Sequence, residues 1–311
     1  MQAIAVNEYG AAPTMMQLPN PTPAADQVLV KVRAAGMNPM DREISNGGWQ
    51  GRMPGKFPLV LGSDVAGVVE ARGEKATRFA PGDAVFGQLL LAPLGSFGTY
   101  AEYVAVGENA PITRMPEQLD PVVAASLPTA GVSAQEIVES LGPLSGKTVL
   151  IIGAGGGVGS FATQFAAQAG AHVDADAHAD AERRMLDYGA ADTWNQIGPL
   201  LVGAVREAHP EGIDVVVDTA NDADGFAAVA SLVRRGGTAV TTKFVADVPA
   251  LAKAGVTGVN YVKPMTAAAL DQIANEIVTE RIVPPPIRRI ALGGAPAALN
   301  GHFDGKTIIV L

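Results

Sequence analysis

A run of glycines between two apolar segments is the part of this chain best suited to chemistry. Residues 147–176 read KTVLIIGAGGGVGSFATQFAAQAGAHVDAD. Glycines allow a diphosphate to approach the main chain closely, and free N–H groups at the start of a following helix donate to its oxygens. The candidate dinucleotide-binding loop comprises Gly153, Ala154, Gly155, Gly156, Gly157, Val158 and Gly159.

An acidic residue follows this loop at the distance that dinucleotide-binding folds use. Asp176 lies about 20 residues past the middle glycine, where a carboxylate accepts hydrogen bonds from the adenosine ribose. The same carboxylate would repel a 2′-phosphate, which favours NADH. His178, Arg183 and Arg184 could offset that charge, although the two arginines are more typical of a solvated helix face.

Alternating strands and helices are expected to position the loop. Apolar runs at 149–152, 171–175, 214–218 and 238–242 predict strands, and amphipathic segments at 181–189 and 224–235 predict helices. This alternation is typical of a doubly wound parallel sheet. Asp218, Thr241 and Lys243 come at the carboxyl ends of two of these strands, where ligands bind, so they are candidate cofactor contacts. Lys243 could reach the cofactor or donate a proton, although it is more typical of a plain surface lysine.

The segments on either side of this α/β region have a different character. Residues 1–120 contain valine-rich runs broken by Pro and Gly, which predict a small antiparallel β-barrel or sandwich. An alanine-rich helix is expected at 265–280. A last strand at 305–311 has no obvious place in a parallel sheet, and we expect it to return to the first domain.

Length, charge and composition exclude several kinds of partner and of site. A length of 311 residues suggests about two domains, and a net charge of −9 argues against a nucleic-acid partner. The absence of cysteine excludes disulfides, thiolate catalysis and cysteine-ligated zinc. The four histidines at 172, 178, 209 and 302 offer no metal-ligand spacing. No apolar run is long enough for a membrane span and no signal peptide is evident, so a cytoplasmic protein without a membrane partner is expected.

Several segments together carry a family resemblance. They are AAGMNPMD (34–41), LGSDVAGVV (61–69), FAPGDAVFG (79–87), GTYAEYVAV (98–106), SLPTAGVSA (126–134), IIGAGGGVGSFATQFA (151–166) and DVVVDTA (214–220). In this order they resemble the zinc-independent quinone oxidoreductase branch of the medium-chain dehydrogenase/reductase superfamily. The resemblance implies a GroES-like β-barrel catalytic domain (1–122 and 262–311) and a Rossmann domain (123–261), with a cleft between them. It also implies a homodimer through edge strands of the Rossmann sheet, with residues 256–262 at the interface.

The resemblance also assigns roles to residues of the first domain. Asn38, Ser63 and Thr129 stand where zinc-dependent relatives hold their metal, and none is a good zinc ligand, so no metal is expected. Asn38 could hydrogen-bond substrate or cofactor, or form a self-bonded Asn-Pro turn. Thr129 could contact the nicotinamide carboxamide, or be a helix-entry hydroxyl. Asp41 is expected to orient the loop.

The implied chemistry is hydride transfer from NADPH or NADH to a small conjugated acceptor such as a quinone. An enoyl reductase is the alternative, but such enzymes carry a tyrosine where this chain has Glu43 or Trp49. Trp49 could stack on a planar substrate or cap the barrel. A nucleotide-binding protein without catalytic activity is the third hypothesis. The family resemblance favours NADPH, whereas the carboxylate of Asp176 favours NADH, so the choice of cofactor stays open.

Overall fold

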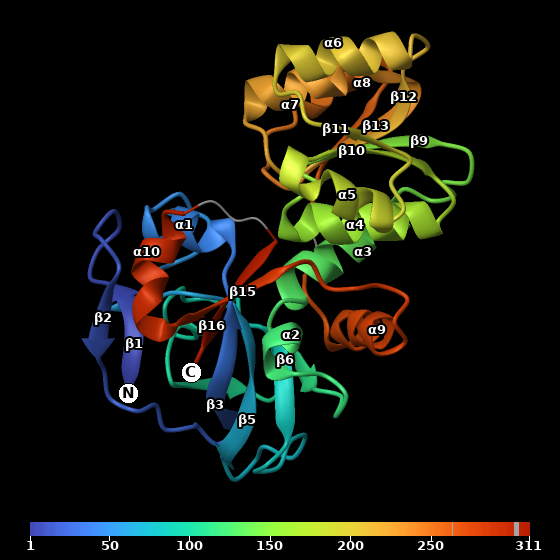
Figure 1. Cartoon of the computed structure of the whole chain (residues 1–311). Helices are drawn as coiled ribbons and strands as arrows, with labels where there is room; N and C mark the ends of the chain where they lie inside the picture. The colour runs from blue at the N-terminus through green and yellow to red at the C-terminus, as the bar shows by residue number, and fades with distance from the viewer. Residues whose placement is uncertain (263, 302–304) are drawn as a thin grey trace. The chain divides into compact units, whose positions relative to one another are not determined.

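The computed structural model describes residues 1–262, 264–301 and 305–311. The chain divides into two compact units, Met1–Val132 with Met265–Leu311, and Ser133–Pro264 (Figure 1). The first break therefore comes at residue 132, against an expectation of 122. Helix α2 (Pro121–Ala124) explains the difference, because it packs on strands β3 and β5 of the first unit.

The first unit is built mainly from antiparallel strands. Its elements are β1 (Gln2–Val6), β2 (Thr14–Gln17), β3 (Gln27–Gly36), α1 (Pro39–Ser45), β4 (Leu59–Val60), β5 (Asp64–Arg72), β6 (Ala84–Gln88), β7 (Tyr103–Gly107), β8 (Ile112–Arg114), α2, the π-helical segment η1 (Pro128–Val132), α9 (Ala267–Val278), β15 (Ile287–Ala291), the 3₁₀ turn η2 (Leu292–Gly294), α10 (Ala295–Leu299) and β16 (Lys306–Val310). Among the described residues, one sheet runs β15-β16-β3-β5-β6-β8 with β7 also paired to β3, and a smaller sheet runs β2-β1-β4.

Alternating burial explains the main strands of this unit. Along β3 every second side chain from Val28 is buried, as expected for a strand with one face on the core. Val30, Val65 and Phe79 belong to that core. The terminal strand β16 pairs antiparallel with β3 and places Ile309 opposite Ala35, so the predicted return of the chain end to the first unit is confirmed.

The second unit is a parallel sheet flanked by helices. Its elements are α3 (Ser133–Ser140), β9 (Thr148–Ile152), α4 (Gly157–Gln168), β10 (His172–Asp176), α5 (Ala179–Asp187), β11 (Asp192–Trp194), α6 (Pro199–Ala208), β12 (Ile213–Asp218), α7 (Ala223–Ala230), β13 (Val233–Thr241), α8 (Val248–Ala254) and β14 (Thr257–Asn260). Within the described part of the chain the strand order is β11-β10-β9-β12-β13-β14, with every pairing parallel. Figure 1 shows α4 and α5 on one face and α6, α7 and α8 on the other. The predicted doubly wound Rossmann fold is confirmed.

The helix predicted at 224–235 is too long. Helix α7 ends at Ala230, and Val233 already pairs with Ile213 as the first residue of β13. The apolar run continues across that boundary, so helical periodicity alone could not locate it. The sequence also gave no prediction for β11 and β14, which are short and form the edges of the sheet. None of the helices in the described ranges is both long and apolar enough to cross a membrane.

Candidate functional site

The glycine loop connects the central strand β9 to helix α4. Gly153 has a φ of +74°, and a Cβ there would lie 2.7 Å from Thr219 Oγ1, so a side chain is excluded by both backbone and space. Gly156 is the N-cap of α4 and has an extended main chain. The loop therefore ends in the exposed amide end of a 12-residue helix, which is a favourable place for a diphosphate.

Two glycines of the loop have separate physical roles. A Cβ on Gly159 would lie 2.2 Å from the carbonyl oxygen of Gly153, so Gly159 allows α4 to pack against the loop. A Cβ on Gly156 would meet only that same oxygen, at the ordinary distance of 3.4 Å. The protein itself therefore does not require a glycine at 156, whereas a ligand lying against the helix end would.

The remaining residues of the loop complete the turn. Ala154 is buried and its N–H donates to the carbonyl oxygen of Asp176 at 2.9 Å, while Ser160 Oγ donates to the Ala154 carbonyl oxygen at 3.0 Å. Gly157 and Val158 form the first turn of α4, whose N–H groups are not used within the helix. The structure thus assembles all seven predicted loop residues into one turn.

Asp176 ends strand β10 beside this turn. Its Oδ2 accepts a hydrogen bond from the Gly153 N–H at 3.3 Å. Burial raises the pKa of Asp176, while the Gly153 N–H and nearby His178 oppose that rise. His178 is the N-cap of α5. The predicted acid therefore lies at the carboxyl edge of the sheet, next to the loop.

The two arginines of α5 differ in their surroundings. Arg183 is 85% exposed and pairs with Asp187, as a solvated helix face predicts. Arg184 instead donates from Nη2 to the Gly155 carbonyl oxygen at 3.1 Å and is partly buried. The solvated-face interpretation was therefore wrong for Arg184, which brings a positive charge to the glycine loop.

Asp218 and Thr241 serve mainly to shape the strand ends. Asp218 is fully buried, and its Oδ1 accepts the N–H groups of Ala220 and Asn221, both at 2.9 Å. Burial raises the pKa of Asp218, and those amides oppose the rise. Thr241 is also buried, and its Oγ1 accepts the Lys243 N–H at 3.0 Å. The Asp218 and Thr241 side chains order the loops at the carboxyl edge of the sheet and do not project from it.

A pocket of about 320 Å³ opens at this same edge. Its size is at the lower end of the range for ligand sites and suits an adenine ring with its ribose. The sequence did not indicate its apolar wall, because most of those residues lie in the segment after β11 and in α6 and α7 and carry no motif. Besides Asp176, the pocket is lined by Ile152, Ile197, Gly198, Pro199, Leu201, Val202, Asn221, Asp224, Gly225, Ala228 and Val229.

The first unit holds a second group of functional candidates, connected around Asp64. Asn38 Nδ2 donates to Asp64 Oδ2 at 2.9 Å, and Thr129 Oγ1 donates to Asp64 Oδ1 at 2.6 Å. Lys306 Nζ donates to Asn38 Oδ1 at 2.7 Å. Gln88 Nε2 donates to Thr129 Oγ1 at 2.7 Å. Asn38 and Thr129, which the family resemblance assigned to one site, thus both contact Asp64. The sequence analysis did not identify Asp64 and Lys306, which hold them.

Asp41 joins this network through the loop main chain. Its Oδ2 accepts the Asn38 N–H at 2.8 Å and the Tyr100 hydroxyl at 2.6 Å. The predicted role of Asp41 in orienting the loop is confirmed by these contacts. Burial raises the pKa of Asp41 to about 7, although the two hydrogen bonds oppose that rise.

The other two charged groups of the network are also taken out of water. Burial raises the pKa of Asp64, with the Lys306 ammonium as the main opposing influence. Burial lowers the pKa of Lys306, and Asp64 at 3.8 Å opposes that fall. Each group thus compensates part of the other's desolvation cost.

The polar side chains predicted to be catalytic are already hydrogen-bonded within the protein. Asn38 is 4% exposed, and both its amide oxygen and nitrogen are hydrogen-bonded. The Thr129 hydroxyl both donates and accepts. Trp49 packs against the core cluster of the first unit, with the Arg52 guanidinium 5.9 Å from its ring centre, which agrees with a barrel-capping aromatic.

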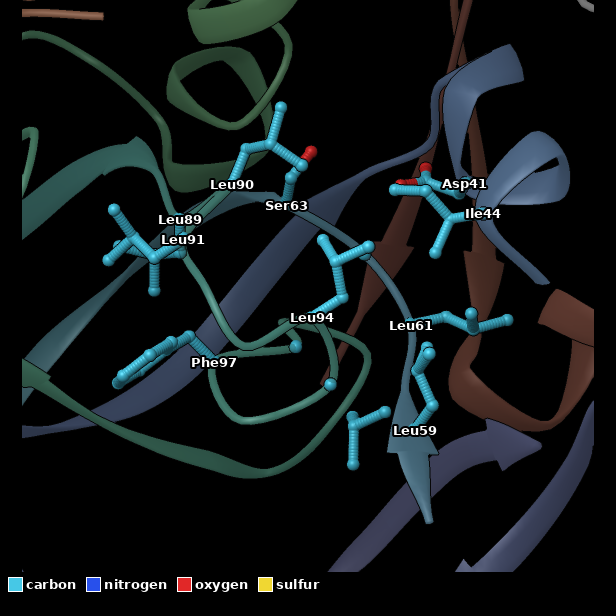
Figure 2. A pocket seen from close by; sticks show the side chains of 14 residues that line it. Asp41, Ile44, Leu59, Leu61, Ser63, Leu89, Leu90, Leu91, Leu94 and Phe97 are labelled. Atoms are coloured by element: carbon cyan, nitrogen blue, oxygen red, sulfur yellow. The ribbon is translucent and has the colours of Figure 1, made fainter. Parts of the chain in front are cut away.

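An apolar cavity lies beside Asp41. Figure 2 shows Asp41 and Ile44 of α1 on one side and Leu91 and Phe97 on the other, with Leu94 between them. Its volume is about 20 Å³, far below the roughly 300 Å³ of a small-molecule site. This cavity alone cannot hold a quinone ring.

Comparison with known proteins gives two family matches. Residues 24–117 match the family described as alcohol dehydrogenase GroES-like domain, and residues 157–253 match the family described as zinc-binding dehydrogenase. The mitochondrial NAD(P)H oxidoreductase RTN4IP1 of Mus musculus is 31% identical over 91% of this chain and 81% of its own length. The quinone oxidoreductase of Lama guanicoe is 32% identical over 70% of this chain and 66% of its own length.

Solved structures extend the likeness to the whole chain. The quinone oxidoreductase from Coxiella burnetii has a TM-score of 0.85 at 24% identity, covering 100% of this chain and 99% of that one, which shows a common fold. A mycobacterial protein complexed with NADPH has a TM-score of 0.86 at 26% identity, covering 100% of both chains.

Proposed function

Because this chain belongs to the medium-chain dehydrogenase/reductase superfamily and is an oxidoreductase of the quinone oxidoreductase type, we propose that it transfers hydride from NADPH or NADH to a quinone or similar conjugated acceptor. The observation that carries this proposal is the loop before α4. It presents the end of a helix together with a glycine at 156 that the protein's own packing does not need.

The residues of the second unit fit a nicotinamide dinucleotide. The N–H groups at the start of α4 would bind its diphosphate, Asp176 would accept from its adenosine ribose, and the pocket lined by Ile152 and Ile197 would take its adenine. When bound, the cofactor supplies the hydride. Arg184 and Asp176 bring opposite charges to the same edge and would together set the preference between NADPH and NADH.

We propose that the reaction needs no zinc. The side chains at the positions corresponding to the family's catalytic metal site are Asn38, Ser63 and Thr129, which offer neither thiolate nor imidazole. The ammonium of Lys306, 2.7 Å from Asn38 Oδ1, would repel a cation there. This donor set does not fit zinc, and activity should survive treatment with a chelator.

Asn38 acts in this proposal as a positioning residue. Because both ends of its amide are bonded within the buried network, it holds the loop after β3 in place and does not contact the acceptor directly. A reduced quinone oxygen can take its proton from water, so no tyrosine is needed at the position of Glu43 or Trp49. The need for a tyrosine proton donor therefore distinguishes enoyl reduction from quinone reduction.

A panel of acceptors tests the proposal. Purified protein would be given NADH or NADPH with a naphthoquinone, a simple enone or a crotonyl thioester, and cofactor oxidation would be followed at steady state. We expect oxidation with the naphthoquinone. Oxidation with the thioester alone would contradict the proposal in favour of an enoyl reductase, and tight cofactor binding without turnover of any acceptor would indicate a nucleotide-binding protein without catalysis.

A further inference from the structure

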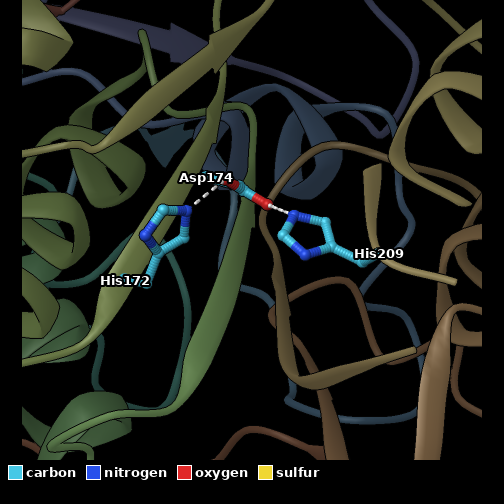
Figure 3. A group of neighbouring side chains, drawn as sticks. All are labelled: His172, Asp174 and His209. Atoms are coloured by element: carbon cyan, nitrogen blue, oxygen red, sulfur yellow. Dashed lines mark ion pairs between the residues drawn. The ribbon is translucent and has the colours of Figure 1, made fainter. Parts of the chain in front are cut away.

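Two histidines and an aspartate meet on the second unit, away from the glycine loop. His172 and Asp174 lie two residues apart on β10 and so share a face of the strand, and His209 follows the end of α6. Asp174 Oδ2 is 2.7 Å from His209 Nε2, and Oδ1 is 3.5 Å from His172 Nε2 (Figure 3). The sequence predicted no metal-ligand spacing among the histidines. The fold nevertheless brings His172, Asp174 and His209 together, although His172 and His209 are far apart in the chain.

The aspartate of this group is buried without a well-aligned hydrogen bond. Asp174 is 0% exposed, and neither of its oxygens accepts a hydrogen bond of ordinary geometry. Burial raises the pKa of Asp174, and the charges of His209 and His172 oppose the rise. A buried carboxylate is costly unless a cation compensates it. The only groups that the described residues place there to do so are two imidazoles, which are also common metal ligands.

The distances suit a single ion at the centre of the group. Zinc bonds to imidazole and carboxylate are about 2.0–2.1 Å long, so neighbouring ligand atoms in a tetrahedral site lie about 3.3–3.4 Å apart. Of the two contacts of Asp174, the one to His209 at 2.7 Å is shorter than that spacing and the one to His172 at 3.5 Å is slightly longer. All three ligand atoms lie within 4.8 Å of one another. Asp192, on the adjacent strand β11, has Oδ2 3.2 Å from His172 Nε2 and is exposed, so it could complete a fourth position.

We infer that His172, Asp174 and His209 bind a divalent transition-metal ion, with zinc as the best match. Two imidazoles with one or two carboxylates favour zinc or its neighbours in the first transition row over magnesium and calcium, which prefer all-oxygen sites. Figure 3 shows the two rings on either side of the carboxylate, with one nitrogen of each ring turned towards it.

The position of the group indicates a structural ion. His172 begins β10 and Asp176 ends it. At about 3.3 Å per residue, His172 and Asp174 lie roughly 13 Å and 7 Å along the strand from Asp176, so an ion that they share would lie between those distances. Bound metal would join β10 and the segment after α6, and β11 as well if Asp192 takes part. It would stabilise the second unit without touching the reacting atoms. The inference is therefore independent of the proposed function.

Metal titration of the intact chain tests the inference. Protein stripped with a chelator would be titrated with zinc chloride by isothermal calorimetry, and with cobalt(II) followed by visible absorption. We expect one ion per chain, a cobalt spectrum typical of tetrahedral nitrogen and oxygen ligands, and a higher melting temperature with zinc but not with magnesium.

Variants identify the ligands. His172→Gln changes a half-exposed side chain and His209→Gln a more buried one, and each should weaken zinc binding by at least the roughly 10–100-fold that losing a supporting outer-shell group costs. His178→Gln is the matched control, since this histidine caps α5 outside the group, and it should bind zinc as the wild type does. The absence of zinc binding at millimolar concentration, or equal affinity in all three variants, would overturn the inference.

Discussion

The buried carboxylate of Asp41 should make the first unit less stable as pH rises. Its pKa is about 7 in the folded protein against 3.8 for the free side chain, a difference of about 3 units that is worth about 4 kcal/mol. Since the folded state holds the proton more tightly, the stability that it gives is complete below pH 3.8 and is lost as pH rises through 7. Asp41→Asn cannot titrate, so it escapes this loss.

The expected difference can be measured without assuming that both units unfold together. The chain has two tryptophans, Trp49 in the first unit and Trp194 in the second, so a Trp194→Phe background leaves Trp49 to report on the unit that contains Asp41. Urea unfolding would be followed by fluorescence at pH 5, 6, 7 and 8. The free energy of unfolding of Asp41→Asn minus that of its parent should increase by about 3 kcal/mol between pH 5 and 8.

A second variant tests the cause of the shift. The Tyr100 hydroxyl donates to Asp41 Oδ2 and so stabilises the ionised form. Removing it in Tyr100→Phe should raise the pKa of Asp41 in the folded protein further. The pH-dependent loss of stability should therefore continue to higher pH. If the difference between Asp41→Asn and its parent stays constant from pH 5 to 8, Asp41 does not hold its proton in the folded state and the reasoning fails.

The remaining predictions concern the second unit. Gly159→Ala should lower the free energy of unfolding by at least about 1–3 kcal/mol, because its Cβ would press on the Gly153 carbonyl oxygen, and an unchanged urea midpoint would contradict that packing. Asp176→Ser should raise the ratio of kcat/KM for NADPH to that for NADH about 10-fold, or about 1.4 kcal/mol, and an unaltered ratio would show that Asp176 does not contact the ribose. Val262→Asp, at a position 72% exposed just after edge strand β14, should convert the proposed dimer to a monomer in light scattering, and a monomeric wild type would refute the dimer.

The dinucleotide-binding loop could be predicted from the sequence because its signals are local. Glycines, a buried strand and an acid at fixed spacing lie within 30 residues, and the structure assembles them as the spacing requires. Arg184 was misjudged because an arginine on a helix is usually solvated, and only the fold shows that this one reaches the Gly155 carbonyl oxygen.

The network of the first unit could not be predicted in the same way. Lys306 contacts Asn38 across almost the whole length of the chain, and no pattern in the sequence encodes that pairing. A signal did exist, since Asp64 and Lys306 are charged residues at the starts of buried strands, where charges are rare unless paired. The same limit applied to His172 and His209, which come together because the end of α6 brings His209 to Asp174 of β10.

The most direct test is the affinity of the protein for NADPH and NADH when Gly156 is replaced by valine. Gly203→Val is the matched control, because a side chain on that exposed glycine of α6 meets nothing within 4 Å, and the Cβ at 156 makes only the one ordinary contact with the Gly153 carbonyl oxygen. The wild type and Gly203→Val should bind at least one nicotinamide with equal affinity, whereas Gly156→Val should fold normally and bind at least about 100-fold more weakly, a loss of about 3 kcal/mol. Equal affinity in all three proteins would show that the diphosphate does not lie against the start of α4.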